Sequence, residues 1–290
     1  MKAPRLIKQR NEIEAKMDTT DRQSETRRED ARTLFPRLGK PLVNEVLKHR
    51  MHGHATVEDL HALRVALRRM RTLLWAWRPL LDRDAVERDR AFLRRVAAAA
   101  GGARDWDIAM TLVDTEDREF QGERVDAARR KARKSAETTL SAADLKHTLP
   151  DILNAVKSGL KTGRASMPAT RFARKRVLAA REALGKRIRR ARKADKREYD
   201  AWHDVRKGAK KLRYLLEFFS PMASHGYKGK LRSLKKIQKK FGLLNDAVAT
   251  ERLLTNHRDV FVNDAAAQAA LTKLHKECRR RQRAASNMLG

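Results

Sequence analysis

The sequence has little cysteine, proline or glycine: one, seven and 13 residues among 290. A single cysteine, Cys278, excludes an intramolecular disulfide and any cysteine-rich zinc module, and it fits a reducing compartment. Proline and glycine are the residues that most often interrupt helices, whereas alanine, leucine, arginine and lysine favour them. No run of alternating β-branched and polar residues is long enough for a strand. We therefore predict an all-α fold.

Long hydrophobic runs are also missing. No stretch reaches the roughly 18 apolar residues of a membrane span, and the first residues lack the apolar segment of a secretory signal. We therefore expect a cytoplasmic protein with no membrane partner.

Acidic residues and aromatics are scarce. The chain has 68 lysines and arginines against 36 aspartates and glutamates, which gives a net charge of +32, and aromatics make up only 5% of it. Such an excess exceeds what solubility requires and predicts a polyanionic partner. Nucleic acid, an anionic membrane surface and inorganic polyphosphate all satisfy this condition, and charge alone does not choose among them.

The sequence does contain a repeated segment. Residues 61–74 recur as residues 203–216, an offset of 142 positions, with basic residues and a histidine at the same spacing. Steps of three, four and three residues gather these side chains on one face of a helix. We name the two sets the first stripe and the second stripe. The first stripe is His61, Arg64, Arg68 and Arg71, and the second is His203, Arg206, Lys210 and Arg213.

Each of these helices also has an apolar face, roughly opposite its stripe, that we assign to the core. The apolar residues are Leu63, Leu67, Met70, Leu74 and Trp77 in the first copy, and Val205, Ala209, Leu212, Leu216 and Phe219 in the second. Like charges at i, i+3 and i+4 repel by a few tenths of a kcal/mol per pair. A bound anion would therefore relieve the repulsion on the basic faces.

Turn-forming residues indicate how the chain is organised. Thr56 can cap the first repeated helix, and Pro79 and Pro221 end the two copies at equivalent places. The segment 161–168 is the best linker, so we expect halves at 31–165 and 166–290 after a charged N-terminal segment at 1–30, either a solvated helix or a disordered tail. Each half should form a helical bundle.

A second repeated feature follows each stripe. Gly101 and Asp105 align with Gly242 and Asp246 at an offset of 141. Glycine commonly ends helices and aspartate commonly caps them, so we predict a helix end at each glycine and a capped new helix at each aspartate. Separate helices are then expected at 84–100 and 105–117, and at 227–241 and 246–257.

These features resemble the CHAD family, the conserved histidine α-helical domain. The resemblance rests on both stripes, on Arg213-Tyr214-Leu215-Leu216-Glu217, and on the predicted turns at 101–107 and 238–246, and it covers about residues 31–290. It implies two bundle halves related by a pseudo-twofold, a central basic groove or pore, and binding of inorganic polyphosphate. The family often appends this domain to a triphosphatase domain of the CYTH type. No Glu-x-Glu-x-Lys strand is present here, so the chain is similar to stand-alone members.

The resemblance and the spacing together define a candidate polyphosphate site. Arginine suits bidentate contacts with phosphate oxygens, whereas lysine acts as a point charge. The alternative for each cation is an ordinary solvated face, and for each histidine it is a helix-start residue hydrogen-bonded to the backbone. Because both copies carry the histidine on the basic face, we favour phosphate contact, with the imidazolium form available to it. Arg69 and Lys211 lie beside the stripes, and the helices that follow supply further cations. The candidates are His61, Arg64, Arg68, Arg69, Arg71, Arg94, His203, Arg206, Lys210, Lys211, Arg213, Lys235 and Lys239.

Other chemistry has little support in the sequence. No nucleophile arrangement accompanies both copies, and no phosphate-binding Gly-x-x-x-x-Gly-Lys-(Ser/Thr) motif occurs, so we expect no catalytic residues and no cofactor. A loose cluster of His49, His52 and His54 could in principle hold a metal ion, but no further ligand is evident, and we expect no metal site.

The sequence therefore predicts a non-catalytic inorganic polyphosphate-binding protein that is associated with polyphosphate granules. A nucleic-acid-binding protein that uses the same basic surface is the alternative. No aromatic residues interleave the stripes, so stacking of bases has little support.

Overall fold

The computed structural model describes residues 29–49, 56–113, 120–160, 163–194, 199–223 and 227–288. Most of the predicted N-terminal segment therefore lies outside the described residues. Within these ranges the fold is all-α, as predicted, with nine α-helices and no β-strand. The helices are α2 (Ala31–Lys48), α3 (Val57–Trp77), α4 (Arg83–Leu112), α5 (Gly122–Ala142), α6 (Leu145–Gly159), α7 (Ala169–Lys193), α8 (Tyr199–Phe218), α9 (Lys228–Asn256) and α10 (Asp264–Ser286).

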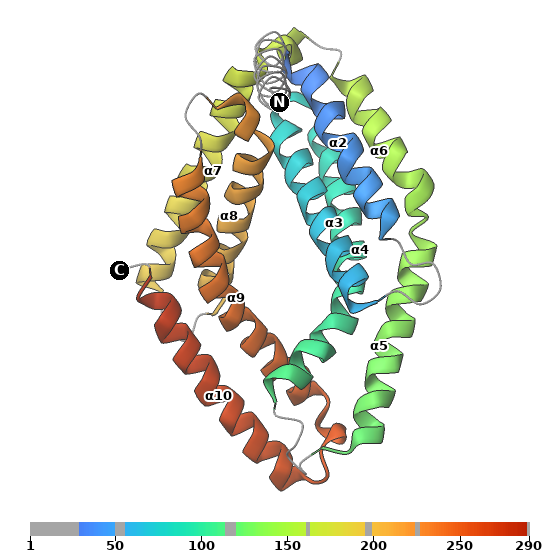
Figure 1. The fold of residues 1–290 in the computed structure, drawn as a ribbon, viewed down its shortest axis with the longest axis vertical. Helices are drawn as coiled ribbons and strands as arrows, with labels where there is room; N and C mark the ends of the chain where they lie inside the picture. Colours follow the sequence, from blue (N-terminus) through green and yellow to red (C-terminus); the bar gives the residue numbers. More distant parts are fainter. Residues whose placement is uncertain are drawn as a thin grey trace, which may run out of the picture.

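The helices form an elongated four-sided frame (Figure 1). Helices α3 and α8 face each other across its middle and converge towards one end, while α4 and α9 cross towards the other end. Helices α2, α6 and α5 lie along one side of the frame, and α7 and α10 lie along the other. The two helices that carry the stripes are thus the inner ones.

The start and end signals of α3 act as the sequence predicts. The Thr56 hydroxyl accepts from the Asp59 backbone N–H, and the Asp59 carboxylate accepts from the Thr56 backbone N–H, which completes a capping box. A short 3₁₀ turn containing Pro79 follows α3, and one containing Pro221 follows α8. Helices α3 and α8 begin at 57 and 199, and α5 and α10 begin at 122 and 264, so both pairs begin 142 residues apart.

The predicted apolar faces of α3 and α8 are buried. Where the two helices converge, Trp77 packs against Phe172 and Phe219, with ring centroids 4.5 and 6.1 Å apart, and against Phe35 at 5.4 Å. The Trp77 indole N–H also donates to the Ala31 carbonyl at 2.8 Å. We call this packing the aromatic end; it belongs to an apolar core that both halves of the chain share.

A second, smaller core lies where α4 and α9 cross. Trp106 on α4 and Leu254 on α9 are buried there, together with Val125 of α5 and Leu274 of α10. The Phe120 and Phe261 rings pack with centroids 4.7 Å apart beside them. The frame is therefore closed by apolar packing at both ends, which fixes how α3 and α8 face each other.

The prediction that Gly101 and Gly242 end helices is wrong. Helix α4 runs through Gly101, and α9 runs through Gly242, so four predicted helices are two long ones. Asp105 and Asp246 accordingly lie inside helices rather than at N-caps. Burial of Ala100 and Ala103 against the core holds α4 together across the glycine, because tertiary packing outweighs the roughly 1 kcal/mol that glycine costs a helix.

Gly101 has a packing reason instead. A Cβ at this position would lie 3.3 Å from the Cζ and Nη2 atoms of Arg64. The Arg64 guanidinium also donates to the Gly101 carbonyl from Nη1, at 3.4 Å. The missing side chain thus makes room for a cation of the first stripe. No such neighbour lies within 4 Å of a Cβ built at Gly242.

Candidate anion-binding site

The fold brings the two stripes together. Lys210 on α8 is repelled by Arg206 of its own helix and by Arg68 and Arg64 of α3. Arg206 in turn repels Arg64 and Arg68 across the same space. Arg104 of α4 joins the group, because it repels His61, Arg64 and Arg68. We name this set the interhelical cluster: His61, Arg64, Arg68, Arg104, Arg206 and Lys210.

Burial of these cations alters their ionisation. Lys210, Arg64 and Arg68 are all half-buried, and burial lowers the pKa of Arg68 to about 10. Burial, reinforced by Arg206 and Arg68, lowers the pKa of Lys210 to about 6. At neutral pH the Lys210 amine is therefore largely neutral in the free protein, and an anion nearby would favour its protonation.

Acidic partners in this region are few. The Arg64 Nη1 atom lies 3.7 Å from the Asp105 carboxylate, and Asp246 is near enough to attract Lys210. Burial raises the pKa of Asp105 against the opposing effect of Arg64, and Asp246 adds to the rise. Arg213, further along α8, lies 3.6 Å from Glu217, which follows it by one helical turn. These carboxylates balance only part of the positive charge.

Several guanidinium groups have buried donors without acceptors. In the part of the chain that the structure describes, the Nε atoms of six arginines are buried and have no hydrogen-bond partner. Buried donors are normally paired, and an oxygen of a bound anion is one partner that would satisfy these atoms. The six arginines are Arg69, Arg71, Arg90, Arg176, Arg206 and Arg213.

The two predicted histidines are held differently. His61 is exposed at the start of the first stripe, whereas His203 is half-buried. The His203 Nδ1 atom lies 3.3 Å from the Tyr199 hydroxyl, which donates to the Asn245 side chain at 2.9 Å. Burial and then Lys207 and Arg206 lower the pKa of His203 to about 4, so this imidazole is neutral in the free protein at neutral pH.

A second basic group lies around Trp75, near the aromatic end. The Arg176 Cζ atom is 4.2 Å and the Lys211 Nζ atom 4.3 Å from the centroid of the Trp75 ring. Arg187, Arg90 and Arg71 are close enough to repel Lys211, whose pKa burial and these neighbours lower to about 8. We name this set the Trp75 cluster: Arg71, Arg90, Arg176, Arg187 and Lys211 around Trp75.

The remaining predicted cations lie outside the two clusters. Arg69 packs over the Phe218 ring at 5.6 Å, and exposed Arg94 repels Arg71 from the next helix. Lys235 and Lys239 are exposed on α9 and form no hydrogen bond or ion pair with the described residues of either cluster. Sequence reasoning missed Arg90, Arg104, Arg176 and Arg187, because they belong to neither stripe and only the packing brings them near one.

The described residues hold no group of three or more histidine, cysteine, aspartate or glutamate side chains that could bind a metal ion. His49 instead lies 3.0 Å from Asp59 at the start of α3, and His52 and His54 lie outside the described residues. Among the described helices, none is both long and apolar enough to cross a membrane.

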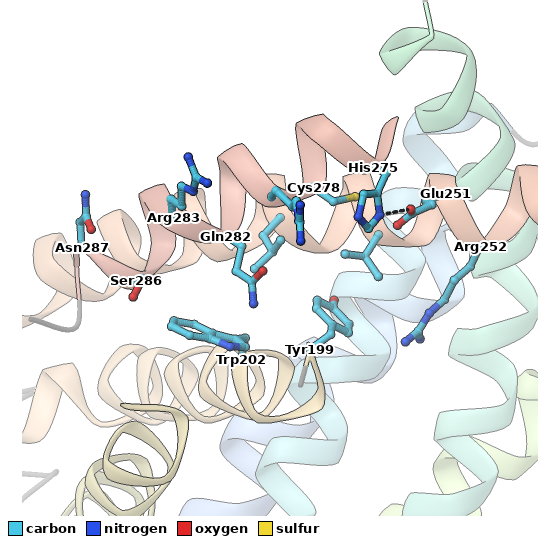
Figure 2. Close-up of a pocket in the computed structure, with 13 residues that line it drawn as sticks. Tyr199, Trp202, Glu251, Arg252, His275, Cys278, Gln282, Arg283, Ser286 and Asn287 are labelled. Carbon is cyan, nitrogen blue, oxygen red and sulfur yellow. Dashed lines mark hydrogen bonds and ion pairs between the residues drawn. The ribbon is translucent and has the colours of Figure 1, made fainter. Parts of the chain in front are cut away.

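A separate pocket of about 1180 Å³ lies between α8, α9 and α10 (Figure 2). Trp202 and Tyr199 lie on one side, and Gln282 and Arg283 of α10 lie on the other. At one end the His275 Nδ1 atom is 3.0 Å from Glu251. Burial and the Glu251 carboxylate raise the pKa of the Cys278 thiol to about 12, so it is not a thiolate at neutral pH.

Solved structures of other all-helical proteins share this fold. The CHAD domain of the plant Ricinus communis superposes with a TM-score of 0.70 at 21% identity, over 91% of this chain and 92% of that one. PptA from Streptomyces chartreusis superposes with a TM-score of 0.64 at 20% identity, over 90% and 97% of the two chains. At these identities the likeness shows the fold.

The sequence itself settles the family. The CHAD domain family model matches residues 37–255, which include both stripes, and the chain therefore belongs to the CHAD family. No curated protein matches the sequence.

Proposed function

We propose that this protein binds inorganic polyphosphate without catalysing a reaction, and that α3 and α8 provide the binding surface. The observation that carries the proposal is the interhelical cluster. Cations of two helices face one another there with few carboxylates between them. Like-charge repulsion of this kind is relieved by a bound polyanion.

The chemistry of the cluster favours phosphate groups over other anions. Most of its members are arginines, whose forked donors match phosphate oxygens, and the Arg206 Nε atom is buried without an acceptor. Polyphosphate is an unbranched chain of such groups and displays no bases. Membership of the CHAD family supports the same ligand.

Nucleic acid is the rival that the test must exclude. Recognition of single strands relies on aromatic side chains that stack on bases. Trp202 and Tyr214 adjoin the second stripe in sequence, but both are buried. The ring of Trp75, one turn beyond the first stripe, is already in contact with two cations. Phosphate contacts alone would leave nucleic acid with no advantage over polyphosphate.

Binding without turnover suits a protein that coats stored polymer. We propose that the protein associates with polyphosphate granules in the cell, where it organises or protects them. A fluorescent fusion should co-localise with granules, and a fusion in which both stripes are neutralised should be diffuse.

The decisive experiment is a competition at matched phosphate concentration. Labelled long-chain polyphosphate is bound at an ionic strength of about 0.15 M and challenged with unlabelled RNA, duplex DNA or polyphosphate. Polyphosphate should displace the label at far lower concentrations than either nucleic acid. Equal or better displacement by RNA or DNA would overturn the proposal, and release of orthophosphate during incubation would contradict its non-catalytic part.

A further inference from the structure

The Trp75 cluster differs from the interhelical cluster in the helices and residues that form it. It combines side chains of α3, α4, α7 and α8, whereas the interhelical cluster uses α3, α4 and α8. Three of its arginines, Arg71, Arg90 and Arg176, have buried Nε atoms without hydrogen-bond partners among the described residues. Arg176 is held in place by its contact with the Trp75 ring and by a 3.2 Å hydrogen bond from Nη2 to the Trp75 carbonyl.

The charge of this cluster is poorly balanced. Glu87 is the carboxylate that attracts Arg71, but it is already shared by two other arginines. Its Oε1 atom lies 2.6 Å from Arg90 and 3.5 Å from Arg78. Arg176 and Lys211 contact the Trp75 ring, and Arg71, Arg90 and Arg187 are close enough to repel Lys211. Among the described residues, the carboxylate shown to attract a member of this set is Glu87, which is already paired, and this favours a ligand group with more than one negative charge.

The internal repeat does not reproduce this cluster at three of its positions. At the sequence offset that relates the stripes, the position of Trp75 is taken by Glu217, and that of Arg187 by Glu45. Leu34 stands in the position of Arg176 in the same comparison. The counterpart of this cluster therefore has two acids and an apolar residue where the cluster has an aromatic ring and two arginines.

The cluster lies at a closed end of the inner helices. Trp75 is two residues before Trp77, whose ring packs against Phe172 and Phe219 where α3 and α8 converge (Figure 1). Trp75 lies one helical turn beyond Arg71 and continues the first stripe towards the end of α3 at Trp77. A linear polymer that follows the stripe in this direction therefore reaches the Trp75 cluster where α3 ends.

We propose that the Trp75 cluster binds a terminal phosphate of linear polyphosphate, so that one end of the chain is anchored beside the aromatic end. The proposal rests on the proposed function and specifies the part of the polymer that this cluster takes. An internal phosphate carries one negative charge, whereas a terminal phosphate, like a phosphate monoester, carries about 1.5 to 2 at neutral pH. The extra charge suits the unbalanced cations.

Linear and cyclic triphosphate provide the test, because the ring has no terminal phosphate. Isothermal titration of the full chain should show one site for linear triphosphate and binding at least about tenfold weaker for cyclic trimetaphosphate. The double variant Arg176→Gln/Lys211→Met should lose this preference. The matched variant Arg206→Gln/Lys210→Met, which removes the same number of cations from the interhelical cluster, should keep it.

Two outcomes would overturn the proposal: equal binding of the linear and cyclic forms, or a preference that survives in Arg176→Gln/Lys211→Met. Thermal melting of both double variants verifies that they are folded. If Arg176→Gln/Lys211→Met unfolds, the single variant Lys211→Met, which leaves the Arg176 contacts intact, replaces it in the titrations. Failure of the proposed function would give a different result: in the competition experiment, nucleic acid would displace long-chain polyphosphate, whatever the triphosphate titrations show.

Discussion

Lys210 shows how the folded chain sets the charge of a single side chain. Burial and neighbouring arginines lower its pKa from 10.5 to about 6. Between these two values the unfolded chain binds more protons than the folded protein, so this residue makes stability rise with pH across that window. Below the folded pKa both states are protonated and the full cost of burying the charge remains.

Binding of polyphosphate should therefore take up protons. At about pH 7.5 the Lys210 amine is mostly neutral in the free protein, and a bound phosphate favours its charged form. Titration calorimetry in buffers of different ionisation enthalpy should show uptake approaching one proton per site, and Lys210→Met should remove most of it. Lys131→Met, at an exposed position on α5 outside both clusters, is the control and should leave the uptake unchanged. Equal uptake in the two variants would contradict this assignment.

The two faces of α3 should respond oppositely to substitution. Replacing Arg64, Arg68 and Arg71 by alanine should weaken polyphosphate binding strongly and leave the melting temperature unchanged or slightly higher, because repulsion between like charges is relieved. Leu67→Asp should unfold the first half, since Leu67 is fully buried and the charge would have no partner. Circular dichroism melts distinguish the two. Loss of the fold in the arginine variant would mean that the stripe is structural.

At the scale of helices, Gly101 and Gly242 both lie inside long helices, so their substitutions can be compared directly. Gly242→Ala should stabilise the protein by up to about 1 kcal/mol, because alanine favours a helix interior and nothing opposes its Cβ. Gly101→Ala should stabilise less and weaken polyphosphate binding, because its Cβ meets the Arg64 guanidinium. Denaturant unfolding and binding titrations measure both effects. An identical binding constant in the two variants would show that Arg64 does not depend on the space at Gly101.

The helices that the sequence predicts correctly are those defined by local signals. Periodicity identified both faces of α3 and α8, and Thr56 and the two prolines marked their limits. The break at Gly101 was predicted wrongly because burial of the neighbouring alanines, a tertiary effect, outweighs the local preference of glycine. The Trp75 cluster could not be predicted, since Arg90, Arg176 and Lys211 come from three helices that only the fold brings together.

For the whole molecule, the question is whether the stripes form one site or two. A long chain that engages both stripes gains from effective concentration, whereas a short oligomer engages only one. Neutralising Arg206/Lys210/Arg213 should then reduce long-chain affinity far more than twofold and short-oligomer affinity much less. Neutralising Arg64/Arg68/Arg71 should reduce long-chain affinity as strongly, but it also removes Arg71 of the Trp75 cluster and should weaken linear short oligomers too. The slope of log affinity against log salt should also fall, because fewer phosphates are contacted. If each variant merely halves the stoichiometry at unchanged affinity, the stripes bind separately.

The small core where α4 and α9 cross has a consequence for synthesis of the chain. Trp106 and Phe120 are made early, but their partners, among them His257, Phe261 and Leu274, come more than 130 residues later. At ribosomal speeds of about 5 to 20 residues per second, this apolar patch waits on the order of ten seconds for its cover. The nascent first half therefore exposes an apolar surface until α10 has been synthesised. We expect chaperones to bind this surface during that interval.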